Sequence, residues 1–435
     1  MDQTQPGSST DQLDARQPLK LSYALRALRH RNFRLFFAGQ LISLIGTWMQ
    51  SVAQSWLVYR LTGSALLLGT VGFAGQIPVL LAAPLGGIVA DRYNRHRIVI
   101  ATQVASMVLA LVLAWLTLTG YVKVWHVAAL AACLGVVNAF DIPARQSFIV
   151  DMVGKGDLMN AIALNSSMFN SARMIGPAVA GILVASIGEG WCFFANGISY
   201  LAVIAGLLMM QVTPVSRQAR ADSPLENILE GFRFARSSLP IRWLLLLLAL
   251  ASLVGAPYAV LMPIFAGEIL HGGPRALGIL MGATGIGALL GALTLAARRG
   301  LRGLGRWIAL ASGGFGVSLI LFAYSRVFWL SALILIPTGY ALMVQMGSTN
   351  TLVQSMTPDH MRGRVMAIYS MMFMGMAPFG ALLAGGAAHP FGAPVTVAAG
   401  GLLCIAGAIV YSRQLPAFRE EARRLILAQQ ESREP

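Results

Sequence analysis

The sequence predicts an all-α integral membrane protein with about twelve transmembrane helices in two six-helix halves. Only 11% of the 435 residues are charged and 56% are hydrophobic, whereas soluble domains carry about a quarter charged residues. Apolar stretches long enough to cross a bilayer recur along the chain, and one polar break divides them into two sets of six. The solvent for most of this chain must therefore be lipid.

The chain opens with a polar segment, residues 1–20, that we expect to be a disordered cytoplasmic tail. The N-terminal half, residues 21–212, then holds six apolar stretches. Each has roughly the 20 residues that a helix needs to cross the bilayer core. They lie near residues 34–57, 65–90, 98–119, 125–149, 160–186 and 191–211.

The two halves are joined by a polar linker, residues 213–240, which contains an amphipathic stretch around residues 225–234. The C-terminal half, residues 241–412, repeats the rhythm, and a charged tail at 413–435 follows it. Weak internal similarity, LMNAIALNSS against GRVMAIYSMM, supports a repeat of two halves. The apolar stretches of this half lie near 242–266, 275–297, 304–324, 328–355, 364–386 and 391–411.

The basic residues fall mostly on one side of this layout. Most of the 32 Lys and Arg lie in both tails, the linker and alternate loops, whereas the opposite side receives only Arg60, Lys123, Arg275 and Arg326. The positive-inside rule assigns the basic side, with both termini, to the cytoplasm. The net charge of +15 therefore sets orientation and does not predict a nucleic-acid partner, which would need one shared basic face.

The sequence motifs of several enzyme classes are absent from this chain. The chain has no Walker loop, HExxH or GxSxG, so ATP-driven or hydrolytic chemistry has no support. The three cysteines each lie inside an apolar run, without metal-ligand spacing. We expect no enzyme activity, no cofactor and no bound metal.

The loop after the second span reads GGIVADRYNRHR. We expect Gly87 to permit close helix packing and Asn94 to tolerate a left-handed turn. The loop arginines can pair with acids below the fourth span, such as Asp151 or Asp157, in a cluster that latches the two halves in one state. The alternative is that the arginines only hold the loop inside. This gating loop comprises Gly87, Asp91, Arg92, Arg95, Arg97 and Asp151.

That loop resembles the major facilitator superfamily signature G-xxx-D-R/K-x-G-x-R/K-R/K, with Asn94 in place of its Gly. Together with NFRLFFAGQLISLIGTWMQSVAQSWLVYRLTGS, NAFDIPARQSF and NAIALNSSMFNSARMIGPAVAG, it looks like the transmembrane secretion effector branch, which includes enterobactin exporters and macrolide efflux proteins. The resemblance implies a major facilitator fold and export of a siderophore or drug-like small molecule by proton antiport. It covers most of residues 20–410, and the second half has no good copy of the loop.

The fifth span carries ARMIGPAVAG, a partial match to the superfamily's antiporter motif, with Arg173 or its neighbour where an early Gly would stand. Small residues allow close helix approach and a proline can bend the helix, which suits a helix that seals a cavity. The alternative is a packing kink that has no bearing on the direction of transport. The predicted kink residues are Gly176, Pro177, Gly181 and, in the eleventh span, Pro378.

Ionisable residues inside spans are costly and are functional candidates by default. Asp141 and Arg145, four residues apart on the fourth span, can pair on one helix face. Together with Arg173 they are the candidates for proton or substrate coupling, the alternative for Asp141 and Arg145 being a permanent structural ion pair.

A polar stripe on the first span is expected to face a central cavity. Polar groups on spans four, five and ten extend it, and interhelical hydrogen bonding is the alternative for each. These residues are Gln40, Ser43, Thr47, Gln50, Gln54, Asn138, Asn165, Asn170, Asn350 and Gln354.

The resemblance therefore implies a monomeric exporter in a bacterial cytoplasmic membrane, whose partners are a small-molecule substrate, protons and the lipid bilayer. An importer or lipid flippase on the same fold is the first rival, since fold does not fix direction. A membrane sensor or scaffold that transports nothing is the second.

Overall fold

A computed structural model describes residues 25–211, 224–298 and 300–431. Within these ranges, twelve helices are long and apolar enough to cross a membrane, and their positions confirm the twelve predicted spans. The predicted tail at 1–20 and the first part of the linker lie outside the described residues.

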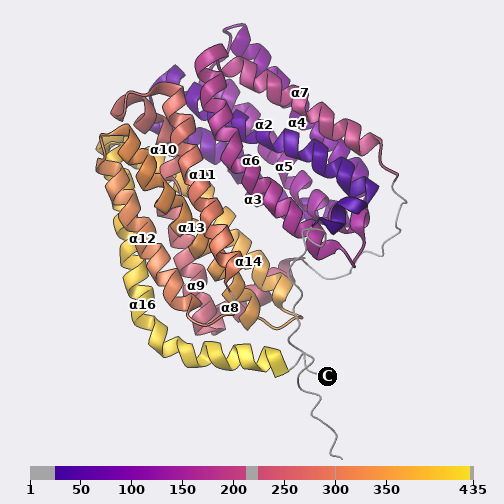
Figure 1. Cartoon of the computed structure of the whole chain (residues 1–435), viewed down its shortest axis with the longest axis vertical. Coiled ribbons are helices and arrows are strands. Elements are labelled where there is room, and N and C mark those ends of the chain that lie inside the picture. Colours follow the sequence, from indigo (N-terminus) through magenta and orange to yellow (C-terminus); the bar gives the residue numbers. More distant parts are fainter. Residues whose placement is uncertain (1–24, 212–223, 299, 432–435) are drawn as a thin grey trace, which may run out of the picture.

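The first six spans form one helical bundle, drawn indigo to magenta in Figure 1. A short 3₁₀ turn, η1, at Arg26–Arg29 precedes them. Gly63 ends the first span in the left-handed region at φ 58°, and the Ser64 hydroxyl then caps the next helix by accepting from the Leu67 amide. The spans are α2 (Arg31–Thr62), α3 (Ala65–Arg92), α4 (Arg95–Leu118), α5 (Val124–Val153), α6 (Leu158–Ile187) and α7 (Glu189–Leu208).

The amphipathic part of the linker forms α8 (Pro224–Ser237), which packs against the start of the eleventh span. The six spans of the C-terminal half follow, drawn rose to yellow in Figure 1. The seventh span consists of α9 (Leu239–Leu250), the π-helical segment η2 (Ala251–Gly255), α10 (Tyr258–Ile264) and the π-helical segment η3 (Phe265–Ile269). The others are α11 (Gly273–Ala297), α12 (Leu304–Tyr324), α13 (Phe328–Met356), α14 (Arg362–Met374) with α15 (Ala377–Phe391), and α16 (Ala393–Glu431).

Two prolines explain local departures from regular helix. Pro257 lacks a backbone N–H and precedes α10 after η2. Pro378 lies in the first turn of α15, directly after the break at residues 375–376 that divides the eleventh span. Past the twelfth span, α16 continues without interruption through residue 412 into the predicted charged tail.

The two bundles meet along α6 with α11 and along α3 with α15. We call the end of the molecule that carries the α3–α4 loop and α8 the linker end, and the opposite end the far end. The closest approaches lie toward the far end, where a Cβ on Gly181 would be 2.8 Å from the Gly278 Cα and one on Gly69 would be 2.9 Å from the Gly385 Cα. Toward α8 the ribbons diverge (Figure 1).

Candidate functional site

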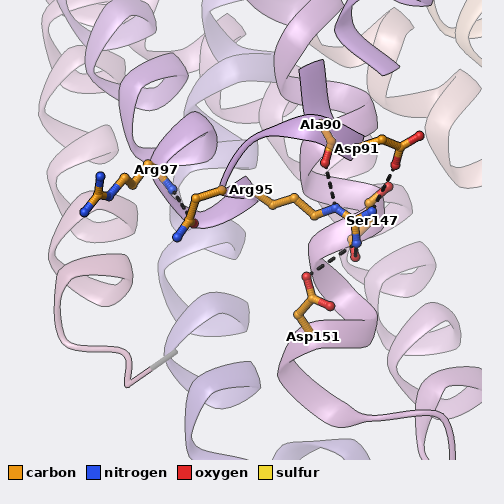
Figure 2. A network of polar contacts seen from close by, with 7 residues as sticks. Ala90, Asp91, Arg95, Arg97, Ser147 and Asp151 are labelled. Carbon is orange, nitrogen blue, oxygen red and sulfur yellow. Dashed lines mark hydrogen bonds and ion pairs between the residues drawn. The ribbon is translucent and has the colours of Figure 1, made fainter. Parts of the chain in front are cut away.

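Arg95, the first residue of α4, joins three helices at the linker end (Figure 2). Its guanidinium donates to the Ala90 carbonyl of α3 at 3.0 Å and to the Ser147 carbonyl of α5 at 3.0 Å. It also pairs with Asp91 at 3.1 Å and with Asp151 at 3.4 Å. The planar fork of an arginine suits such a set of acceptors, and it fixes the turn between α3 and α4 against α5.

The other groups of the gating loop are arranged differently from the prediction. Asp157 pairs with Arg26 at 2.9 Å and with His30 at 2.8 Å, and not with the loop arginines. Arg92 and Arg97 are exposed. All contacts of Arg95 described above lie within the N-terminal half, so in this conformation Arg95 braces the helices of that half.

Two predictions about the backbone of this loop are wrong. Asn94 has φ −67° and is not left-handed; its side chain caps α4 by accepting from the Arg97 amide at 3.3 Å. A Cβ on Gly87 would meet nothing within 4 Å, whereas one on Gly86 would overlap the Ala139 carbonyl oxygen of α5. The glycine that permits close packing is therefore Gly86.

Asp141 is buried between α4 and α5 and has donors on both carboxylate oxygens. Thr102 and Gln103 of α4 donate to Oδ1 at 2.8 and 3.0 Å. Arg145, one turn along α5, contacts Oδ2 at 3.1 Å, so Pro143 between them does not prevent the pairing. Both carboxylate oxygens therefore have a protein partner in this conformation, which fits the alternative of a structural ion pair.

The polar stripe of α2 faces α7 over much of its length. The Gln50 carbonyl accepts from the Asn196 amide at 2.7 Å, and the Thr47 and Tyr200 hydroxyls are 3.5 Å apart. These contacts favour the interhelical interpretation for Thr47 and Gln50. The buried members of the stripe are Gln40, Ser43 and Gln50, and the partly buried members are Thr47 and Gln54.

The remaining polar candidates bond mainly within their own helices. The Gln354 amide donates to Asn350 at 2.6 Å, and the Asn170 amide donates to the Ser166 carbonyl at 2.8 Å. Asn138 and Asn165 are partly buried. Their roles as cavity-lining groups remain predictions.

The predicted kink residues of α6 serve as packing positions. Gly176 lies against Trp48 and Ile45 of α2, and Gly181 lies against Gly278 of α11 in the other half. Pro177 is buried within an uninterrupted helix. The GPAVAG segment of α6 thus packs against α2 in its own half and against α11 in the other half.

Arg173 lies near the middle of α6, one turn before Pro177. Its guanidinium carbon is 5.9 Å from the centroid of the Trp48 ring. It is also within electrostatic range of the Tyr258 hydroxyl of α10, which lies near Thr284 of α11. Both halves of the molecule therefore contribute to its surroundings.

Sequence reasoning missed two acids at the far end, because both adjoin loops and were assigned outside the spans. Glu268 of η3 lies within electrostatic range of the Tyr59 hydroxyl of α2, and a Cβ on the adjacent Gly267 would be 2.4 Å from that hydroxyl, so the two halves meet here. Glu189, at the start of α7, pairs with Arg60 at 2.7 Å within the N-terminal half. The isolated glutamates in otherwise apolar sequence were the signal that could have identified them.

Comparisons with known proteins identify the family of this chain. A model described as transmembrane secretion effector matches residues 22–432. A staphyloferrin A transporter of Staphylococcus aureus is 28% identical over 89% of this chain and 98% of its own. A multidrug efflux pump, Tap, of Mycolicibacterium fortuitum is 26% identical over 81% and 88%. An enterobactin exporter, EntS, of Shigella boydii is 25% identical over 82% and 85%.

Solved transporter structures share the fold. The nucleoside transporter NupG superposes with a TM-score of 0.70 at 15% identity, covering 89% of this chain and 99% of its own. A bacterial homologue of the iron transporter ferroportin in an inward-facing state gives 0.65 at 16% identity, covering 88% and 98%. Because the family model spans nearly the whole chain and the fold is that of membrane transporters, this protein belongs to the transmembrane secretion effector family of the major facilitator superfamily.

Proposed function

We propose that this transporter exports a siderophore or drug-like small molecule by alternating access, in exchange for protons. The observation that carries the proposal is the packing of the two halves: close glycine contacts join them toward the far end, whereas Gly87 at the linker end faces open space. Gly87 follows Gly69 by five helical turns, so both lie on the face of α3 that meets α15. That face is closed at one end and open at the other.

The linker end faces the cytoplasm, because the linker and the loops at this end carry most of the basic residues. The described conformation is then the one that accepts a solute from the cytoplasm. Export follows when the linker end closes and the far end opens, as two halves rock around a central site. Relatives named as an efflux pump and as enterobactin exporters support this direction.

Asp141 is the proposed proton site. Its carboxyl group contacts Thr102, Gln103 and Arg145, so a change in its charge would act directly on the α4–α5 contact. In an exporter that exchanges protons for solute, the proton site must have lost its proton when the solute binds from the cytoplasm. Protonation of Asp141 in the opposite state would release Arg145 and couple the two movements.

The test uses purified protein in proteoliposomes of known orientation. Proton release and solute flux are measured while a panel of iron-free siderophores and hydrophobic drugs is added. We expect one solute class to trigger proton movement that Asp141→Asn abolishes. Glu189→Gln is the matched control, because Glu189 is also buried and paired with an arginine of the same half.

The rival functions give different results in the same vesicles. Solute moving toward the cytoplasmic face identifies an importer, and phospholipid transfer identifies a flippase. Flux that persists in Asp141→Asn makes Asp141 structural. No flux with any solute class favours a sensor or scaffold.

A further inference from the structure

Arg173 is an intramembrane cation that has no acidic partner in the described part of the chain. Among the described residues, none of the acids forms an ion pair with it. It differs in this from Arg145, the other arginine deep in a span, which pairs with Asp141. A charge in the apolar part of a membrane is costly unless it is paired, and a side chain at the middle of its helix is too far from either surface for its head group to reach water through lipid.

The neighbours of Arg173 come from both halves at the same depth. Trp48 lies near the middle of α2, and Phe169 of α6 packs on its ring with centroids 5.7 Å apart. Tyr258 and Thr284 lie near the middle of the seventh and eighth spans. Solute sites of repeat-built transporters occur at this depth, where the halves meet.

The aromatic contact compensates Arg173 only in part. A guanidinium 5.9 Å from an indole centroid is at the outer limit of a cation–π interaction. The Tyr258 hydroxyl is a neutral group and supplies no counter-charge to the guanidinium. The positive charge is thus left available for an anion that enters with its own apolar surface.

We propose that Arg173 binds an anionic group of the transported solute, a carboxylate or a comparable oxyanion, while Trp48 and Tyr258 hold the adjoining apolar or aromatic part. This rests on the proposed function and narrows it from small molecules in general to amphipathic organic anions. A guanidinium forms two parallel, charge-assisted bonds with a carboxylate, which discriminates an acid from its ester. Because Tyr258 belongs to the other half, the bound solute touches both halves and is released as they separate.

The test measures binding of radiolabelled 1-naphthoate and of its neutral methyl ester to the protein in lipid nanodiscs, with empty nanodiscs subtracted. We expect wild type to prefer the acid, and Arg173→Gln to weaken acid binding by about tenfold or more while ester binding stays unchanged. Arg173→Lys keeps the charge and should retain part of the preference. Arg306→Gln, an exposed arginine of α12, is the matched control and should bind as wild type.

A thermal measurement separates loss of binding from loss of fold. Arg173→Gln removes an uncompensated charge, so its unfolding midpoint should equal or exceed that of wild type. Wild type without preference for the acid, or Arg173→Gln with unchanged acid binding, would overturn the proposal.

The outcome for Arg173 is distinguishable from the outcome for export. Proteoliposomes that export only neutral or cationic solutes, equally well in Arg173→Gln, refute the anion site and leave export standing. Acid binding that depends on Arg173, in vesicles that show no flux, keeps the anion site and refutes export.

Discussion

Gly86 and Gly87 are adjacent in α3 and have opposite surroundings: a Cβ on Gly86 would overlap the Ala139 carbonyl oxygen, and one on Gly87 would meet nothing within 4 Å. One glycine lets α3 and α5 touch within the N-terminal half. The other lies on the face of α3 that turns toward the C-terminal half, at the end where the two halves are apart.

Alanine at these two positions should therefore have opposite effects on stability. We expect Gly86→Ala to destabilise the protein by about 1–3 kcal/mol, because the backbone of α5 cannot yield to the added methyl group. Gly87→Ala should be neutral or stabilise by about 0.5–1 kcal/mol, since alanine is the better helix former. Thermal unfolding in one detergent compares the pair. A lower midpoint for Gly87→Ala would contradict the open surroundings described for this residue.

Arg95 should matter far more to stability than Asp91. The Arg95 side chain is 12% exposed and bonds to α3 and α5, so Arg95→Gln should cost about 2–4 kcal/mol by leaving buried acceptors unpaired. The Asp91 side chain is 68% exposed, and Asp91→Asn should cost only about 0–1 kcal/mol. Thermal unfolding again gives the readout. Equal losses for both variants would mean that the ion pair, and not the backbone contacts, holds the turn.

The Tyr59 hydroxyl should favour closure of the far end, because it lies against Gly267 and within electrostatic range of Glu268, and so joins α2 to η3 across the two halves. We expect Tyr59→Phe to increase the population in which the far end is open. Spin labels on the exposed far-end residues Thr119 and Arg326 measure the distance by pulsed electron resonance, in a protein whose exposed Cys133 is replaced by serine.

Tyr324→Phe provides the control for that measurement, since Tyr324 is an exposed far-end tyrosine of α12. It should leave the distance distribution as in wild type. An unchanged distribution in Tyr59→Phe as well would show that the glycine contacts alone keep the far end closed.

The sequence predicted the number and positions of the spans, the amphipathic segment that forms α8, and the family. These depend on local properties: the length of an apolar stretch sets a span, and the loop motif and long matching segments identify the branch. The pairing of Asp141 with Arg145 was also predictable, because residues four apart on one helix lie side by side.

The tertiary structure decided every contact between spans. It selected Gly86 over Gly87 for close packing, paired Asp157 with Arg26 and His30, and placed Tyr258 near Arg173. A sequence fixes where a helix begins and ends, because apolar length and capping residues are local. The rotation of that helix about its axis, which decides which side chains meet, depends on how all twelve spans pack together.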